Sequence, residues 1–317
     1  MNNFFRNQHR ERGIMEDLGQ IGFITMAFGA DKYFHQAESL ARSLRRHMPG
    51  FQIAIVTDRK EVGALFDICI PIDPFEIAGT LMKADLYRYS PFEETFFIDA
   101  DCIVAKPFHD QLRRIRQFDF TPVVNKFLSE GDTDLWIRDV GQAIRILNGT
   151  PFPKFNGGVY FYRRGSYAQK VFSTAHSINK RTDELGILDF DKSGPGEETL
   201  LGLALSQMRA TQFYDDGGQL MRTPLNSQGP IHLDVIKGTC SFIKEGRYVS
   251  PAICHFCGEW FDHPAYLVAQ EELLADRSLG RARKYRLWTS YWTRRLKARA
   301  IRKLNRILTP SPQHASW

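Results

Sequence analysis

The sequence predicts an α/β domain with a mostly parallel central sheet, followed by a basic amphipathic helical tail. Apolar runs of strand length alternate with helical periodicity over residues 21–104, in the order strand, helix, strand, strand, helix, strand. The charge is also unevenly divided. Twelve Lys and Arg and no Asp or Glu follow residue 276, which leaves 30 basic against 36 acidic residues in the first 276 positions. We therefore expect a mildly acidic body and a strongly basic tail.

The composition excludes several classes of protein. With 43% hydrophobic and 25% charged residues, the chain is neither disordered nor a small disulfide-stapled scaffold. No uncharged stretch approaches the roughly 18 apolar residues of a membrane span, and the first twenty residues lack the apolar core of a secretory signal. The odd number of cysteines, five, favours a reducing, cytoplasmic setting. Cys254 and Cys257 form a single C-x-x-C, which we interpret as two structural thiols.

The elements of the first half of the chain are the clearest. Residues 21–27 form a predicted buried strand that leads into a turn at Gly29. A helix is expected from Asp31, its predicted capping residue, to a stop at Pro49-Gly50. Further strands are expected at 51–58, 67–73 and 94–104, with a helix over 80–90.

The second half continues the alternation of strands and helices. The expected elements are a strand at 118–124, a helix at 134–147, a turn feeding a strand at 155–162, helices at 166–179 and 197–208, and strand fragments over 209–254. Ligands of such sheets bind at the carboxyl ends of the strands. Polar residues at strand ends are therefore the first candidates for a site.

Asp99 and Asp101 are the clearest of these candidates. Residues i and i+2 of a strand point to the same face, so the two carboxylates should project together with Ala100 turned away. Two like charges this close favour a cation between them, and Mn²⁺ or Mg²⁺ suits carboxylate oxygens. The alternative is a polar strand end that only leaves the core.

Three other short segments carry residue types that suit a ligand site at this edge of the sheet. Asn156 precedes two glycines, which permit positive φ and close backbone approach. Glu197 and Glu198 begin a predicted helix after a Pro-Gly loop, and His255 is a potential metal ligand within H-F-C-G. The ordinary alternatives are a turn, two acids that complement a helix dipole, and a structural histidine.

In this order, the segments resemble the retaining glycosyltransferases of family 8, the glycogenin-like group of the GT-A superfamily. The resemblance spans about residues 21–260 and implies one GT-A, Rossmann-like domain that binds a nucleotide sugar. The matching segments are LMKADLYRYSPFEETFFIDADCIVAKPF (81–108), FNGGVYFY (155–162), GEETLLGLAL (196–205), HFCG (255–258) and TMAFGADKYFHQAESLARSL (25–44).

The resemblance also implies roles for individual residues. Asp99 would hold the nucleotide ribose and the metal, and Asp101 and His255 would complete the protein ligands of Mn²⁺ or Mg²⁺. The remaining contacts to a UDP-sugar would divide into three groups: Lys83, Asn156 and Gly157 at the donor sugar or its phosphates, Glu197 and Glu198 with Asn156 as catalytic groups, and Thr25, Ala27 and Tyr33 around the uracil.

The sequence departs from the family pattern at three places. Glu197-Glu198 replaces the usual Asp-Gln, and Ala30 stands where the family often has a polar uridine contact. No Lys follows H-F-C-G at the usual offset, where the family grips the leaving diphosphate. Lys237 or Lys244 would then have to supply that contact, unless activity is weak or the donor differs.

Residues 281–308 combine basic and aromatic side chains on a helical pattern. The later part of the segment has one apolar face, formed by Leu296, Ala300, Leu304, Ile307 and Leu308. The earlier apolar residues lie on a different face of the helix, which predicts two short helices or a kink near residue 293; they are Leu287, Trp288, Tyr291 and Trp292. Such a segment suits an anionic membrane surface. The alternative is an apolar stripe that packs on the body. No nucleic-acid partner is expected, because no reading motif accompanies the charge.

The sequence thus predicts a flexible N-terminus (1–19), a GT-A domain (20–265) and a helical basic extension (266–317). The expected activity is metal-dependent transfer of a hexose-type sugar from a UDP-sugar to a glycan or lipid-linked acceptor, with retention. The alternatives are a catalytically degenerate nucleotide-sugar-binding protein at the membrane surface and a nucleotidyltransferase. The expected location is cytoplasmic and peripheral, at the inner face of the membrane.

Overall fold

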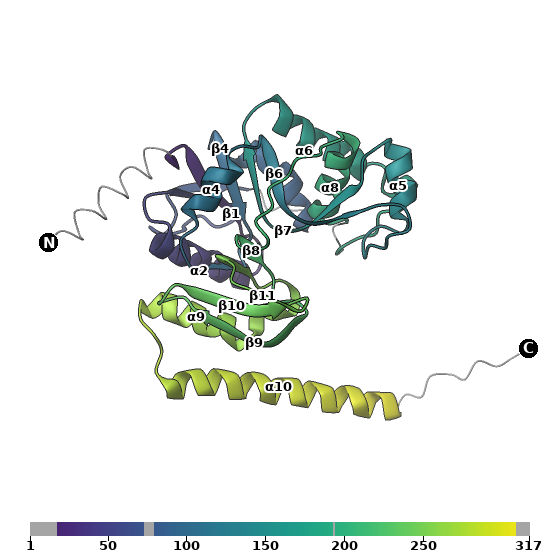
Figure 1. The fold of residues 1–317 in the computed structure, drawn as a ribbon. Helices are drawn as coiled ribbons and strands as arrows, with labels where there is room; N and C mark the ends of the chain where they lie inside the picture. Colours follow the sequence, from purple (N-terminus) through teal and green to yellow (C-terminus); the bar gives the residue numbers. More distant parts are fainter. Residues whose placement is uncertain (1–17, 73–78, 193, 309–317) are drawn as a thin grey trace, which may run out of the picture.

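The computed structural model describes residues 18–72, 79–192 and 194–308 (Figure 1). Most of the predicted flexible N-terminus, residues 1–17, lies outside them, whereas Leu18 is fully buried in the core. At the centre is a six-stranded sheet with the order β3-β2-β1-β4-β7-β6. Its strands are β1 (Ile21–Met26), β2 (Gln52–Thr57), β3 (Ile68–Pro71), β4 (Glu94–Ile98), β6 (Phe120–Leu128) and β7 (Phe152–Arg163).

The predicted α/β fold with a mostly parallel sheet is confirmed. β1, β2, β3 and β4 pair in parallel, and only β7 runs antiparallel to its two neighbours, β4 and β6. Both faces of the sheet are covered by helices, which is why its central strands are almost continuously apolar. In β1 every residue from Ile21 to Met26 is buried.

Alternate residues of the central strands enter two different cores. Phe23 and Phe96 pack with α2 (Asp31–His47) and α4 (His109–Ile115), whereas Ile24 and Phe97 pack on the opposite face. The elements of that second face are η2 (Gly79–Asp85), α3 (Leu86–Tyr89), α5 (Val140–Leu147), α6 (Ser166–Asn179), α7 (Thr182–Leu185) and α8 (Glu197–Gln207).

Two three-stranded sheets complete the body. One has the order β5-β12-β8 (Cys102–Val104, Ile253–His255 and Met221–Arg222), and the other β11-β10-β9 (Arg247–Val249, Thr239–Lys244 and Ser227–Asp234). The antiparallel register of β12 and β5 pairs His255 with Cys102. This long-range pairing brings the H-F-C-G segment beside Asp101.

The predicted strand at 94–104 is wrong in one detail that matters for the site. β4 ends at Ile98 and β5 begins at Cys102, so Asp99-Ala100-Asp101 forms a turn in which the Cys102 N–H donates to the Asp99 carbonyl at 3.0 Å. The two carboxylates therefore gather because the chain turns, and not because a strand alternates. Similarly, residues 155–162 are not a turn followed by a strand, because β7 continues through them.

Three predicted helix boundaries also need correction. Ala30, not Asp31, is the N-cap of α2, and Asp31 lies in its first turn paired with Arg59. The helix expected over 80–90 is the 3-10 helix η2 followed by the short α3. The helix expected from residue 134 begins only at Val140, because Asp139 caps it by accepting from the Gln142 N–H at 2.8 Å.

The C-terminal region consists of η3 (Gly258–Asp262), α9 (Pro264–Ala275) and α10 (Arg281–Leu308). In Figure 1, α10 lies along the outer side of α9 and the β9–β11 sheet. It is one uninterrupted helix, so the predicted kink near residue 293 is wrong. The sequence 281–308 contains no Gly or Pro that would break it.

One face of α10 packs on the body. The Tyr291 side chain is buried, and its ring centroid lies 5.3 Å from that of His263. Burial and the nearby Arg295 lower the pKa of His263 to about 4, so its neutral ring accepts the Ala265 N–H at the start of α9. The adjacent stripe of α10 points to solvent, where Tyr285, Trp292 and Leu296 are exposed.

No helix among the residues that the structure describes is both long and apolar enough to cross a bilayer.

Candidate functional site

Eight of the predicted site residues meet at the carboxyl edge of the central sheet. The turn after β4 supplies Asp99 and Asp101, and β12 ends at His255 beside it. Lys83 reaches this turn from η2. Asn156 and Gly157 come from β7, and Glu197 and Glu198 from the first turn of α8.

Asp101, Cys102 and His255 form a group that could hold a metal ion, with ligand atoms within 4.8 Å of one another. His255 Nε2 lies 2.8 Å from Asp101 Oδ1 and 3.7 Å from Asp99 Oδ2. These two facing atoms form a buried ion pair, and neither has a hydrogen bond to any other described residue. A cation bound here would therefore take the place of this ion pair.

The thiol of Cys102 was not predicted as a ligand. Burial raises the pKa of Cys102 well above its ordinary value, and its Sγ lies 3.8 Å from the carbonyl oxygen of Gly158 as a donor. A neutral thiol is a poor ligand for hard cations, which prefer oxygen and imidazole nitrogen. The donor set that suits Mn²⁺ or Mg²⁺ is therefore Asp99, Asp101 and His255.

His255 and Asp101 behave as a charged pair when no cation is bound. Burial alone would lower the pKa of His255, but the nearby Asp101 carboxylate outweighs it and raises that pKa. Burial alone would raise the pKa of Asp101, but His255 holds it below its usual range. A cation that binds here must displace the His255 proton, which couples metal affinity to pH.

Asn156 orients His255. Its Oδ1 lies 2.5 Å from His255 Nδ1 and also accepts the Gly158 N–H at 3.1 Å. A hydrogen bond at Nδ1 fixes the ring and leaves Nε2 directed at the Asp101 carboxylate. The sequence carried no signal for this contact, because β7 and β12 are far apart in the chain.

Lys83 bridges two carboxylates. Its Nζ lies 2.6 Å from Asp99 Oδ2 and 3.3 Å from Glu197 Oε1. Burial alone would lower the pKa of Lys83, but these two neighbours raise it overall, so the ammonium stays charged. The residue thereby fixes Asp99 and Glu197 relative to each other.

The two adjacent glutamates at the start of α8 have different surroundings. Glu197 is buried, and burial raises its pKa to about 7 although Lys83 acts in the opposite direction. Glu198 is anchored, because its Oε2 accepts the Gly157 N–H at 2.9 Å and its Oε1 lies 3.5 Å from Lys154 Nζ. Whether Glu197 is charged near neutral pH therefore depends on its burial and on the Lys83 ammonium.

The glycine pair in β7 is required by close packing. A Cβ at Gly157 would lie 2.3 Å from Glu197 Oε1, and one at Gly158 would lie 2.4 Å from His255 Nδ1. Neither glycine has positive φ. Of the two sequence arguments for these glycines, close approach is confirmed and a positive φ is wrong.

The predicted uracil contacts lie on the neighbouring β1–α2 segment. The side chains of Thr25 and Ala27 are buried at the end of β1, and Thr25 Oγ1 has no hydrogen-bond partner within the described residues. Tyr33 is 44% exposed, with the Lys32 ammonium 4.7 Å from its ring centroid. Of these three side chains, only that of Tyr33 is exposed enough to contact a ligand directly.

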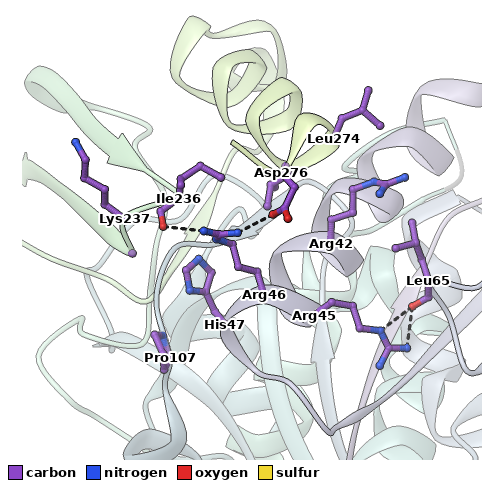
Figure 2. Close-up of a pocket in the computed structure, with 12 residues that line it drawn as sticks. Arg42, Arg45, Arg46, His47, Leu65, Pro107, Ile236, Lys237, Leu274 and Asp276 are labelled. Atoms are coloured by element: carbon purple, nitrogen blue, oxygen red, sulfur yellow. Dashed lines mark hydrogen bonds and ion pairs between the residues drawn. The ribbon is translucent and has the colours of Figure 1, made fainter. Parts of the chain in front are cut away.

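The structure distinguishes the two lysines proposed for a diphosphate contact. Lys237 pairs with Asp234 at 3.2 Å and lines a cavity of about 840 Å³ against the C-terminal half of α2, with Arg42, Arg46 and His47 (Figure 2). That cavity adjoins the opposite end of α2 from the Gly29 turn. Lys244 instead lies on β10, and its Nζ donates to the carbonyl oxygen of Leu225. The Leu225 N–H donates to Thr223 Oγ1, which lies 3.3 Å from Cys257 Sγ in the H-F-C-G segment.

Comparisons with known proteins identify the fold of this chain but do not assign it to a family. No model of a known protein family matches the sequence, and no curated protein matches it. Among solved structures, the galactosyltransferase LgtC in complex with donor and acceptor sugar analogs superposes with a TM-score of 0.50 and 14% identity, over 82% of this chain and 97% of that one. The chain has a GT-A fold.

Other matches to this GT-A domain are weaker. The bifunctional glycosyltransferase WbbM has a TM-score of 0.45 at 12% identity, over 81% of this chain and 51% of that one. The glycosyltransferase GlyE of Streptococcus pneumoniae TIGR4 has a TM-score of 0.38 at 14% identity, over 62% and 45%. At 14% identity, the likeness to LgtC shows the fold alone.

Proposed function

We propose that the protein is a metal-dependent glycosyltransferase of family 8 type, which transfers a hexose-type sugar from a UDP-sugar to a glycan or lipid-linked acceptor with retention. The observation that carries the proposal is the pairing of Asp101 and His255, whose facing atoms have no hydrogen bond to any other described residue, with Asp99 and Lys83 beside them. This group lies where ligands of α/β sheets bind. The galactosyltransferase activity of the LgtC match supports the same class.

Each residue then has a role that follows from its surroundings. Asp99, Asp101 and His255 would hold Mn²⁺ or Mg²⁺, which when bound neutralises the charge that gathers on a leaving diphosphate. Lys83 keeps Asp99 and Glu197 in place by its two ion pairs. Glu197 offers a buried carboxylate to the positive charge that develops on the sugar ring.

The experiment is a thermal-shift screen of nucleotides and UDP-sugars with and without Mn²⁺. We expect the melting temperature to rise with UDP or a UDP-sugar only when Mn²⁺ is present, since ligand that binds the folded state stabilises it. A shift with nucleoside triphosphates and none with UDP compounds would favour a nucleotidyltransferase instead. No shift with any nucleotide would contradict the proposal.

Lys244 is the candidate for the missing diphosphate contact. Lys244→Ala should weaken Mn²⁺-dependent UDP binding roughly 10- to 150-fold, because a hydrogen bond to a charged group contributes about 1.5–3 kcal/mol. Lys237→Ala is the matched control and should leave UDP affinity unchanged, since Lys237 pairs with Asp234 at the cavity beside the C-terminal half of α2. Equal affinities of the two variants, measured by calorimetry, would remove Lys244 from the site.

We further propose that α10 holds the enzyme at an anionic, cytoplasmic membrane face, near a lipid-linked or membrane-bound acceptor. The exposed stripe of Tyr285, Trp292 and Leu296 supports this, together with the excess of basic residues along the helix. The packed half of α10 must be kept in any test. Tyr291 is buried, and Lys284 pairs at 2.7 Å with the fully buried Glu272.

Removal of residues 296–317 should therefore weaken binding to phosphatidylglycerol vesicles and leave the melting temperature unchanged. The deletion removes five Lys and Arg, each of which contributes about 1 kcal/mol near an anionic surface. Binding of the full chain should weaken with salt, with a remainder from the aromatic side chains. If the full chain ignores these vesicles even at low salt, the membrane proposal is wrong.

A further inference from the structure

An aromatic pair flanks the candidate site on the side of β6 and β7. The ring centroids of Trp136 and Phe190 lie 5.0 Å apart with the planes inclined by 59°. Phe190 is 46% exposed and Trp136 is half-buried, and the neighbouring Leu135 is 79% exposed. Apolar side chains gathered at the surface beside a polar site indicate a contact surface for a ligand or partner.

Phe190 connects this pair to α8. A Cβ at Gly196 would lie 3.5 Å from Cβ and Cγ of Phe190, so the aromatic side chain rests on the backbone that begins α8. The next residue is the buried Glu197. The Phe190 ring therefore lies beside the residue that precedes Glu197.

Trp136 connects to the site by a second route. The backbone N–H of Trp136 donates to Asp134 Oδ1 at 2.8 Å, and Asp134 Oδ2 lies 2.9 Å from Lys154 Nζ. Lys154 Nζ in turn lies 3.5 Å from Glu198 Oε1. A chain of polar contacts therefore runs from the aromatic pair to the second glutamate of α8.

Backbone contacts hold the two segments that carry Trp136 and Phe190 against each other. The Leu188 N–H donates to the Trp136 carbonyl at 2.9 Å, and Ile137 and Ile187 form a bridge whose side chains are buried. The two rings therefore present a preformed surface, which reduces the ordering cost of binding.

We propose that Trp136 and Phe190 form the binding surface for a pyranose ring of the acceptor, so that the acceptor is a glycan; this rests on the proposed function. One face of a pyranose carries mainly C–H groups, which pack on the electron-rich face of an aromatic ring. Its hydroxyl edge then lies toward polar groups, and Lys154 and Glu198 supply both a donor and an acceptor. Phe190 is exposed, and the side chains of Lys154 and Glu198 remain 21% and 19% exposed.

The test compares transfer with hydrolysis in Trp136→Ala and Phe190→Ala. With Mn²⁺ and UDP-galactose or UDP-glucose, transfer to a panel of p-nitrophenyl glycosides and hydrolysis by water are measured together. The ratio of transfer to hydrolysis should fall at least tenfold in both variants, through a higher KM for the glycoside. Tyr167→Ala is the control, because Tyr167 is a similarly exposed aromatic that follows the far end of β7. Its ratio should not change.

An unchanged ratio in both variants overturns the proposal, and a ratio restored by Trp136→Phe but not by Trp136→Leu supports stacking over simple bulk. A wild-type protein that neither hydrolyses nor transfers any UDP-sugar would instead count against the proposed function. The surface is then tested by a glycan array alone. Loss of array binding in both alanine variants supports it, whereas no bound glycan for the wild-type protein, or equal binding by the variants, overturns it.

Discussion

Replacing Asp101 by Asn should abolish Mn²⁺-dependent UDP binding and leave the fold intact. The substitution keeps the shape of the side chain but removes the negative charge beside His255 Nε2, which lies 2.8 Å from Asp101 Oδ1. Loss of a residue that only supports a metal ligand already costs 10–100-fold in affinity, so loss of a ligand charge should cost roughly 100-fold or more. Calorimetric titration with UDP at saturating Mn²⁺ measures the effect.

Asp110→Asn provides the matched control for this variant. The same Asp-to-Asn change is made on α4, away from the site. The Asp110 side chain is 80% exposed, and its ion pair within the described residues is with Arg113. UDP affinity should be unaffected. If Asp101→Asn binds UDP with Mn²⁺ as tightly as the wild-type protein does, the metal assignment is wrong.

Glu197→Gln should reduce turnover on the order of 100-fold with little change in donor affinity. The carboxylate is buried at the start of α8, 3.3 Å from Lys83 Nζ, and is not part of the Asp101–His255 group that would hold the metal. An interaction made with charge that develops only during the reaction affects kcat and not binding. A wild-type rate in this variant would reduce Glu197 to an acid at a helix end. Glu184→Gln, at an exposed acid on α7, is the control.

The same variant gives a stability measurement that needs no substrate. Burial raises the pKa of Glu197 from 4.5 to about 7, so the folded protein binds the proton more tightly than the unfolded chain does. Ionisation in the fold therefore costs stability at pH values above about 7, and this cost disappears as the pH falls toward 4.5. Metal-free Glu197→Gln should exceed the wild-type free energy of unfolding by up to about 3 kcal/mol at pH 8, and by little near pH 4.5.

The sequence was sufficient for the sheet and for the composition of the site because both depend on local patterns. Continuous apolar runs predict strands that are buried on both faces, as β1 and β4 are. The polar residues that interrupt those runs, such as Asp99 and Asp101, mark the edge where the site lies. Lys83 and Glu197 could be placed near this edge only through the family resemblance, and their 3.3 Å contact confirms that they meet.

Contacts between distant segments could not be predicted from the sequence. Asn156 was expected to contact the donor, but its position against His255 depends on the registers of β7 with β4 and β12 with β5. The Lys154 contacts with Asp134 and Glu198 likewise require the fold. For the tail, an early azimuth of Leu and aromatic residues and a later aliphatic face predicted a kink, whereas α10 is one helix in which Tyr291 is buried and Trp292 and Leu296 are exposed.

The most direct test of the central claim is release of UDP from a panel of UDP-hexoses by the purified full-length protein, with Mn²⁺ and then with excess EDTA. The account predicts that at least one UDP-hexose is hydrolysed with Mn²⁺, that EDTA stops the reaction, and that added Mn²⁺ restores it. Mn²⁺-dependent UDP binding without release from any UDP-hexose would contradict a transferase and leave a nucleotide-sugar-binding protein. Hydrolysis that continues undiminished in EDTA would contradict the metal site at Asp99, Asp101 and His255.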